Sequence, residues 1–111
     1  MDTKLNYSEI IKSLLQAYSD HFKEDGESPL KPIFDDIRHR YLLLYIYWND
    51  QKYIHQTPIH IDIINNKIWI QYDNTEEGIA TDLLEAGVPA EEIVLGFYPD
   101  YVRQHTEFAV A

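Results

Sequence analysis

The chain has 111 residues, of which 45% are hydrophobic and 25% are charged, a composition typical of one globular domain over residues 1–111. It contains no cysteine, so disulfides, thiolate metal sites and cysteine catalysis are excluded. Nine lysines and arginines against nineteen aspartates and glutamates give a formal net charge of −10, which disfavours contact with the phosphates of DNA.

The densest group of basic residues is Arg38, His39 and Arg40, and the neighbouring Asp35 and Asp36 offset it. We interpret this stretch as a solvated turn rather than a nucleic-acid contact. An acidic surface suits a basic protein partner instead. The N-terminus is polar throughout and no apolar run could span a bilayer, so we expect a cytoplasmic protein that does not associate with membranes.

Apolar residues recur at helical spacing through the first part of the chain: Leu5, Ile10, Ile11, Leu14, Leu15, Tyr18 and Phe22. The spacing predicts an amphipathic helix over residues 5–22, with Asp2 or Thr3 as its N-cap and with Gly26 and Pro29 stopping its continuation. Such a stripe can fill a groove in a partner, but an N-terminal helix more often covers a sheet. We therefore expect the helix to pack on the strands that follow.

The next part of the chain predicts strands. "IFDDI" predicts a short strand, and "YLLLYIYWND" is a nearly continuous apolar run, typical of a strand covered on both faces. "QKYIHQTPIHIDII" alternates in part, and its Pro58 indicates an edge position or a bulge. Asn65 and Asn66 separate this run from "KIWIQYD" and fit a two-residue primed hairpin turn. The fold class is therefore α+β, with the N-terminal helix packed on an antiparallel β-meander of about four strands.

A polar stretch after the last of these strands holds four carboxylates: Asp73, Glu76, Glu77 and Asp82. We interpret most of them as a helix start, in which residues 73–75 offer an N-cap and Glu76 and Glu77 occupy the first turn. Gly87 suits the left-handed position after such a helix. Paired acid/base catalysis is disfavoured, because the nearby sequence offers no nucleophile, metal-binding histidine or phosphate loop. "PAEEI" then predicts a short helical turn, and "IVLGF" begins a C-terminal strand or turn.

His60 and Asp62 share one face of their strand, whereas His55 points to the other face. Two ligands are too few for a metal site. We therefore interpret His60 and Asp62 as a structural pair, and expect neither a metal nor a cofactor.

The chain ends in "YPDYVRQHTEFAVA", which concentrates aromatic and apolar residues. Tyr98, Tyr101, Arg103 and Phe108 are the candidate partner-binding residues, because tyrosine and arginine are common anchors of protein interfaces. The alternative is that they pack the C-terminal turn on the domain's own surface, and both interpretations stay open. The apolar end predicts that residues 106–110 are ordered, as a strand on the sheet or across a homodimer.

The stretch "IHIDIINNKIWIQYDNTEEGIATDLLEAGVPAEEIVLGFYPDYVRQHTEFAVA" resembles the XisI family of fdxN element excision controlling factors. The blocks "KIWIQ", "GIA", "LGF" and "RQHTEFAVA" carry most of the resemblance, and "YSEIIKSLLQAY" and the run ending in "WND" match more loosely. The resemblance implies a cyanobacterial origin and a partner, an XisH-like protein encoded nearby. In the founding system of that family both proteins assist a separate site-specific recombinase that removes a DNA element during cell differentiation. The resemblance supplies no catalytic residues.

Three functions are compatible with the sequence. The leading hypothesis is a non-enzymatic regulatory protein that binds an XisH-like partner and so controls site-specific excision of a DNA element. An excisionase-like factor that binds DNA directly would need a basic stripe, which the sequence lacks. An uncharacterised enzyme would need a convergent polar pocket.

Overall fold

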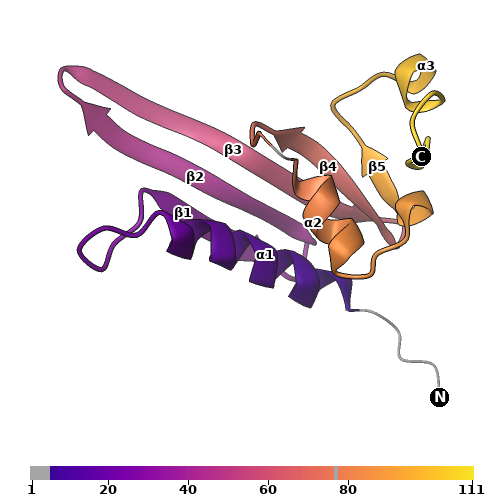
Figure 1. Ribbon diagram of the computed structural model, residues 1–111, viewed down its shortest axis with the longest axis horizontal. Coiled ribbons are helices and arrows are strands. Elements are labelled where there is room, and N and C mark those ends of the chain that lie inside the picture. Colours follow the sequence, from indigo (N-terminus) through magenta and orange to yellow (C-terminus); the bar gives the residue numbers. More distant parts are fainter. Residues whose placement is uncertain (1–5, 77) are drawn as a thin grey trace.

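The computed structural model describes residues 6–76 and 78–111, which form an α+β fold of helices on one mixed sheet. The elements in chain order are α1 (Tyr7–His21), β1 (Leu30–Asp35), β2 (Arg40–Asn49), β3 (Lys52–Ile64), β4 (Lys67–Asp73), α2 (Ile79–Glu85), the 3-10 turn η1 (Ala90–Glu92), β5 (Ile93–Leu95) and α3 (Asp100–Arg103). The sheet order is β1-β2-β3-β4-β5 (Figure 1). The first four strands are the predicted antiparallel meander, and β5 joins β4 in parallel.

Helix α1 begins two residues later than predicted and ends one residue earlier. Its N-cap is Asn6, whose side chain accepts a hydrogen bond from the backbone N–H of Glu9. The predicted caps, Asp2 and Thr3, lie outside the described residues. The Ser19 hydroxyl donates to the carbonyl oxygen of Leu30 at 2.7 Å, which fixes the C-terminal half of α1 against the start of β1.

Both longer helices cover the same side of the sheet. Their fully buried side chains pack against alternate residues of β2, β3, β4 and β5 in one core: Ile11, Leu15, Ile79 and Leu83 from the helices and Tyr41, Leu43, Ile59, Ile61, Ile68, Ile70 and Ile93 from the strands. Burying an isoleucine or leucine completely contributes about 1.5–3 kcal/mol. This single core therefore determines how the helices lie on the sheet.

The prediction that β2 is covered on both faces is wrong. Tyr41 and Leu43 face the helices and are 0% and 1% exposed, but Trp48 on the opposite face is 65% exposed. The physical reason is that both helices pack on one side of the sheet, and the far ends of β2 and β3 project beyond α1 as a hairpin (Figure 1). On the opposite side, Arg103 lies over Trp69 of β4, two strands away from β2.

A predicted turn and a predicted bulge are confirmed within the sheet. Asn65 and Asn66 both have positive φ, 51° and 64°, as a primed hairpin turn requires. Pro58 lies at a bulge, because Thr57 and Pro58 together face the single residue Leu44 of β2. The edge position for Pro58 is wrong, since β3 lies between β2 and β4.

The start of α2 differs from the prediction. The helix begins at Ile79, so Glu76 precedes it and the acid of its first turn is Asp82; Glu77 lies outside the described residues. Asp73 provides the cap from the end of β4. Its carboxylate accepts the backbone N–H groups of Ile79 at 2.7 Å and Thr75 at 3.0 Å.

The end of α2 follows the prediction. Gly87 has a φ of 100°, and its N–H donates to the carbonyl of Leu84 while the N–H of Val88 donates to that of Leu83. This pair of bonds is the Schellman motif, with the buried Val88 as its apolar contact. The predicted short helical turn is η1, which leads into β5.

The C-terminal tail lies along β5 and not in an extra strand. A single parallel bridge joins Val94 to Ala109, and the Ala109 N–H donates to the carbonyl of Ile93 at 2.9 Å. Phe108 packs against the core, and the Lys67 ammonium donates to the carbonyl of Ala111. The tail is therefore tied to its own sheet, as the intramolecular alternative predicts.

We expect Asp73→Ala to lower the free energy of unfolding by about 1–2 kcal/mol, because it removes the acceptor that starts α2. Thermal melting followed by circular dichroism should show a fall of about 4–8 °C for each kcal/mol. Glu76→Gln is the control and should leave the melting temperature unchanged. Equal melting temperatures for Asp73→Ala and the unaltered chain would contradict the cap.

Deletion of residues 107–111 should lower the melting temperature, because it removes Phe108 from the core and the bridge to Val94. Since both contacts are within one chain, the melting temperature should not depend on protein concentration. A melting temperature of the intact protein that rises with concentration would instead place the tail in a dimer contact.

Candidate functional site

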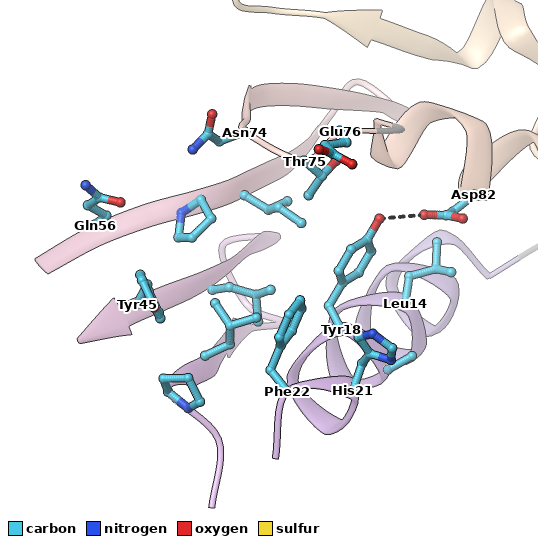
Figure 2. A pocket seen from close by; sticks show the side chains of 16 residues that line it. Leu14, Tyr18, His21, Phe22, Tyr45, Gln56, Asn74, Thr75, Glu76 and Asp82 are labelled. Carbon is cyan, nitrogen blue, oxygen red and sulfur yellow. Dashed lines mark hydrogen bonds between the residues drawn. The ribbon is translucent and has the colours of Figure 1, made fainter. Parts of the chain in front are cut away.

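A candidate site is a surface groove between α1, the sheet and the loop that precedes α2, with a volume of about 750 Å³ (Figure 2). Its lining residues come from three parts of the chain. They are Leu14, Ala17, Tyr18, His21, Phe22, Pro29 and Leu30; then Leu43, Tyr45, Gln56, Pro58 and Ile59; then Asn74, Thr75, Glu76 and Asp82. We call this feature the groove.

One face of α1 forms the apolar wall of the groove. Leu14, Tyr18 and Phe22 follow one another at a spacing of four residues and so line up on one side of the helix. The adjacent row of α1, including Ile11 and Leu15, is buried in the core and fixes the position of this wall. Phe22 is 50% exposed at the rim, so its ring is accessible from the groove.

Strands β2 and β3 form the floor of the groove. Leu43 and Ile59 are paired across the two strands and are each 1% exposed, because they also belong to the core. The bulge at Pro58 lies beside them and displaces the register of the hairpin. The floor is therefore part of the rigid centre of the domain.

The polar end of the groove is built around Tyr18. Its hydroxyl donates to the Asp82 carboxylate at 2.9 Å, which links α1 to α2 (Figure 2). Burial and, after it, this hydrogen bond raise the pKa of Tyr18 to about 12, so the phenol stays protonated and acts as a donor at neutral pH. Glu76 lies close by on the loop. The described lining of the groove thus carries two carboxylates and neither lysine nor arginine.

The C-terminal residues predicted from the sequence lie in different environments. Tyr98 and Tyr101 are 42% and 71% exposed and are accessible to a partner. Arg103 is 9% exposed, with its guanidinium 5.3 Å from the centre of the Trp69 ring and in an ion pair with Asp100. Contact of these residues with a partner stays a prediction.

Phe108 is partly buried and packs against the core. Phe108 and Arg103 thus hold the C-terminal segment on the domain, while the two tyrosines face outward. Arg103 and Phe108 therefore pack on the domain's own surface, while contact of Tyr98 and Tyr101 with a partner stays a prediction.

Sequence reasoning missed the groove. The signal that could have revealed it is the second apolar row of α1, formed by Leu14, Tyr18 and Phe22 beside the buried Ile11 and Leu15. The second row lines the groove, but the rest of the lining comes from elements such as β3 and the loop before α2. No local sequence pattern predicts that these residues lie next to α1.

The polar pairs predicted from the sequence are structural in the described residues. His60 Nε2 lies 2.9 Å from Asp62 Oδ1, and Gln71 donates to the other oxygen of Asp62, which confirms the structural pairing. Arg38 forms an ion pair with Asp35 in the turn between β1 and β2. Over residues 6–76 and 78–111, no three histidine, aspartate or glutamate side chains gather as metal ligands.

Within the same ranges, none of the helices has the length and hydropathy that crossing a membrane requires.

Comparison with known proteins identifies the family. The model of the family described as XisI protein matches residues 1–110. A XisI-like protein from Anabaena variabilis ATCC 29413 has a similar structure, with a TM-score of 0.86 and 36% identity over 95% of this chain and 96% of that chain. The fdxN element excision controlling factor XisI from the same strain has a TM-score of 0.81 and 33% identity at the same coverage. No curated protein matches. The chain belongs to the XisI family.

Proposed function

We propose that this chain is a non-enzymatic accessory protein that acts with an XisH-like partner, encoded nearby, to control site-specific excision of a DNA element. The related structure from Anabaena variabilis is that of an fdxN element excision controlling factor, which supports a regulatory role and a cyanobacterial origin. In this proposal the chain is cytoplasmic. The chain and its XisH-like partner act there on the complex of a site-specific recombinase.

The observation that carries this proposal is the distribution of charge. The net charge is −10, and in residues 6–76 and 78–111 four lysines and arginines are paired with carboxylates. These four are Lys12, Lys23, Arg38 and Arg103. DNA-binding surfaces need clustered, accessible cations to neutralise phosphates, whereas an acidic surface favours association with a basic protein. The chain therefore suits a role beside a nucleic-acid enzyme rather than on the DNA.

The C-terminal segment is the first proposed contact with the partner. Tyr98 and Tyr101 are exposed, and Phe97 packs against Tyr98 with ring centroids 4.5 Å apart. Arg103 and Phe108 keep this segment in place and so present the tyrosines in a fixed position, which lowers the entropy lost on binding.

Co-expression with the XisH-like gene product tests the proposal directly. We expect the two proteins to co-elute in size-exclusion chromatography at low salt and to separate as salt rises, because screening weakens attraction between opposite charges. Tyr98→Ala combined with Tyr101→Ala should weaken the complex while the chain still melts as a folded protein.

A mobility-shift assay with duplex DNA and the purified chain alone supplies the contrasting outcome. We expect no shift. Tight, salt-sensitive binding without any partner would support an excisionase-like factor, and would overturn the accessory role.

A further inference from the structure

We propose that the groove binds a short segment of a partner protein in which apolar side chains lie next to a lysine or arginine. This inference rests on the proposed function, because it names the surface and the chemistry of the partner. Two properties of the groove carry it: an apolar wall with accessible side chains above a buried apolar floor, and a pair of carboxylates at one end.

The apolar part of the groove is suited to binding because it is fixed before any partner arrives. Leu43 and Ile59 in the floor belong to the buried core, and α1 is held by Ile11, Leu15 and the hydrogen bond from Ser19. A rigid site loses little conformational entropy on binding. The exposed ring of Phe22 at the rim contributes most to the free energy of binding, because a partner that covers it removes a large apolar surface from water.

The charge of the groove selects a cation on the partner. Glu76 and Asp82 line the same end, and the hydrogen bond from Tyr18 fixes the Asp82 carboxylate in place. A lysine or arginine there pairs with carboxylates, whereas an acidic or wholly apolar segment leaves them to be desolvated without a partner. The net charge of −10 adds long-range attraction for a basic chain.

The shape of the groove favours a chain segment over a small molecule. Small-molecule pockets enclose most of their ligand's surface. Here the residues along the rim are themselves exposed: His21, Phe22, Gln56, Asn74 and Glu76. An open groove with α1 as its wall and β2 and β3 as its floor fits a peptide segment that lies along it, with its apolar side chains toward the floor.

Two substitutions block the groove, and each has a matched control. Ala17→Arg places a long cationic side chain in the groove from an exposed position of α1, where arginine is a good helix former. Ser13→Arg adds the same charge to an exposed position of α1 outside the lining. Glu76→Lys reverses a carboxylate of the groove, and Glu85→Lys makes the same change of charge on the exposed end of α2, away from the lining.

The first experiment needs no knowledge of the partner. A library of random peptides of about twelve residues is selected on the full-length chain and counter-selected on Ala17→Arg, after melting curves show that the variant is folded. We expect the recovered peptides to combine apolar residues with lysine or arginine, and to bind Glu76→Lys at least about tenfold more weakly than Glu85→Lys. If Ala17→Arg does not fold, counter-selection on Glu76→Lys replaces it. Acidic peptides, or no groove-dependent peptides, would overturn the inference.

The second experiment uses the XisH-like partner with the same four variants and measures the dissociation constant. We expect Ala17→Arg and Glu76→Lys to raise it at least about tenfold, and Ser13→Arg and Glu85→Lys to leave it within about twofold of the unaltered chain. Tight partner binding that all four variants preserve would overturn the inference and leave the proposed function standing. If the chain binds groove-dependent peptides but does not bind the XisH-like partner, the proposed function is overturned and the chemistry of the groove stands.

Analytical sedimentation of the chain alone tests whether a second copy of the chain, rather than a partner protein, fills the groove. A dimer that Ala17→Arg dissociates and Ser13→Arg does not would show that a second copy fills the groove, and would overturn the assignment to a basic partner. The inference predicts that both variants sediment like the unaltered chain.

Discussion

The packing of α1 and α2 on the same face of the sheet is the constraint on which the rest of the structure depends. It creates one core, centred on residues such as Ile11, Ile61 and Leu83, and it joins the helices through the bond from Tyr18 to Asp82. The helices do not cover the whole of this face. The groove lies beside α1, over β2 and β3 and next to the loop before α2, so its walls are made by elements that the core already holds in place.

The same constraint leaves the opposite face of the sheet to be covered by other means. At β4 the C-terminal segment covers it, through the contact of Arg103 with Trp69. Along the projecting hairpin, Trp48 and Tyr53 remain 65% and 50% exposed and contact each other, with ring centroids 5.0 Å apart. Exposed aromatic side chains are common anchors of protein interfaces, which agrees with the accessory role that we propose.

Sequence alone predicted the elements whose signals are local. The period of α1, the Asn65–Asn66 turn and the left-handed Gly87 each depend on neighbouring residues, and each is present in the structure. Asp73 is one of the predicted caps of α2, but the helix begins at Ile79, six residues along the chain, which spacing rules for caps do not anticipate. The one-sided covering of β2 and the whole groove depend on where distant elements pack. The continuous apolar run of β2 has apolar residues on both faces, so the sequence does not show which face the helices cover.

Hydrogen exchange of the chain, alone and in complex with the XisH-like partner, tests the central claim most directly. The claim is that a partner binds in the groove, which has an apolar wall and floor and two carboxylates at one end. It predicts slower amide exchange in the second half of α1 and in residues 74–82 when the partner is bound, with the tip of the β2–β3 hairpin unchanged. Protection confined to other segments, with exchange in α1 and residues 74–82 unaltered, would contradict it.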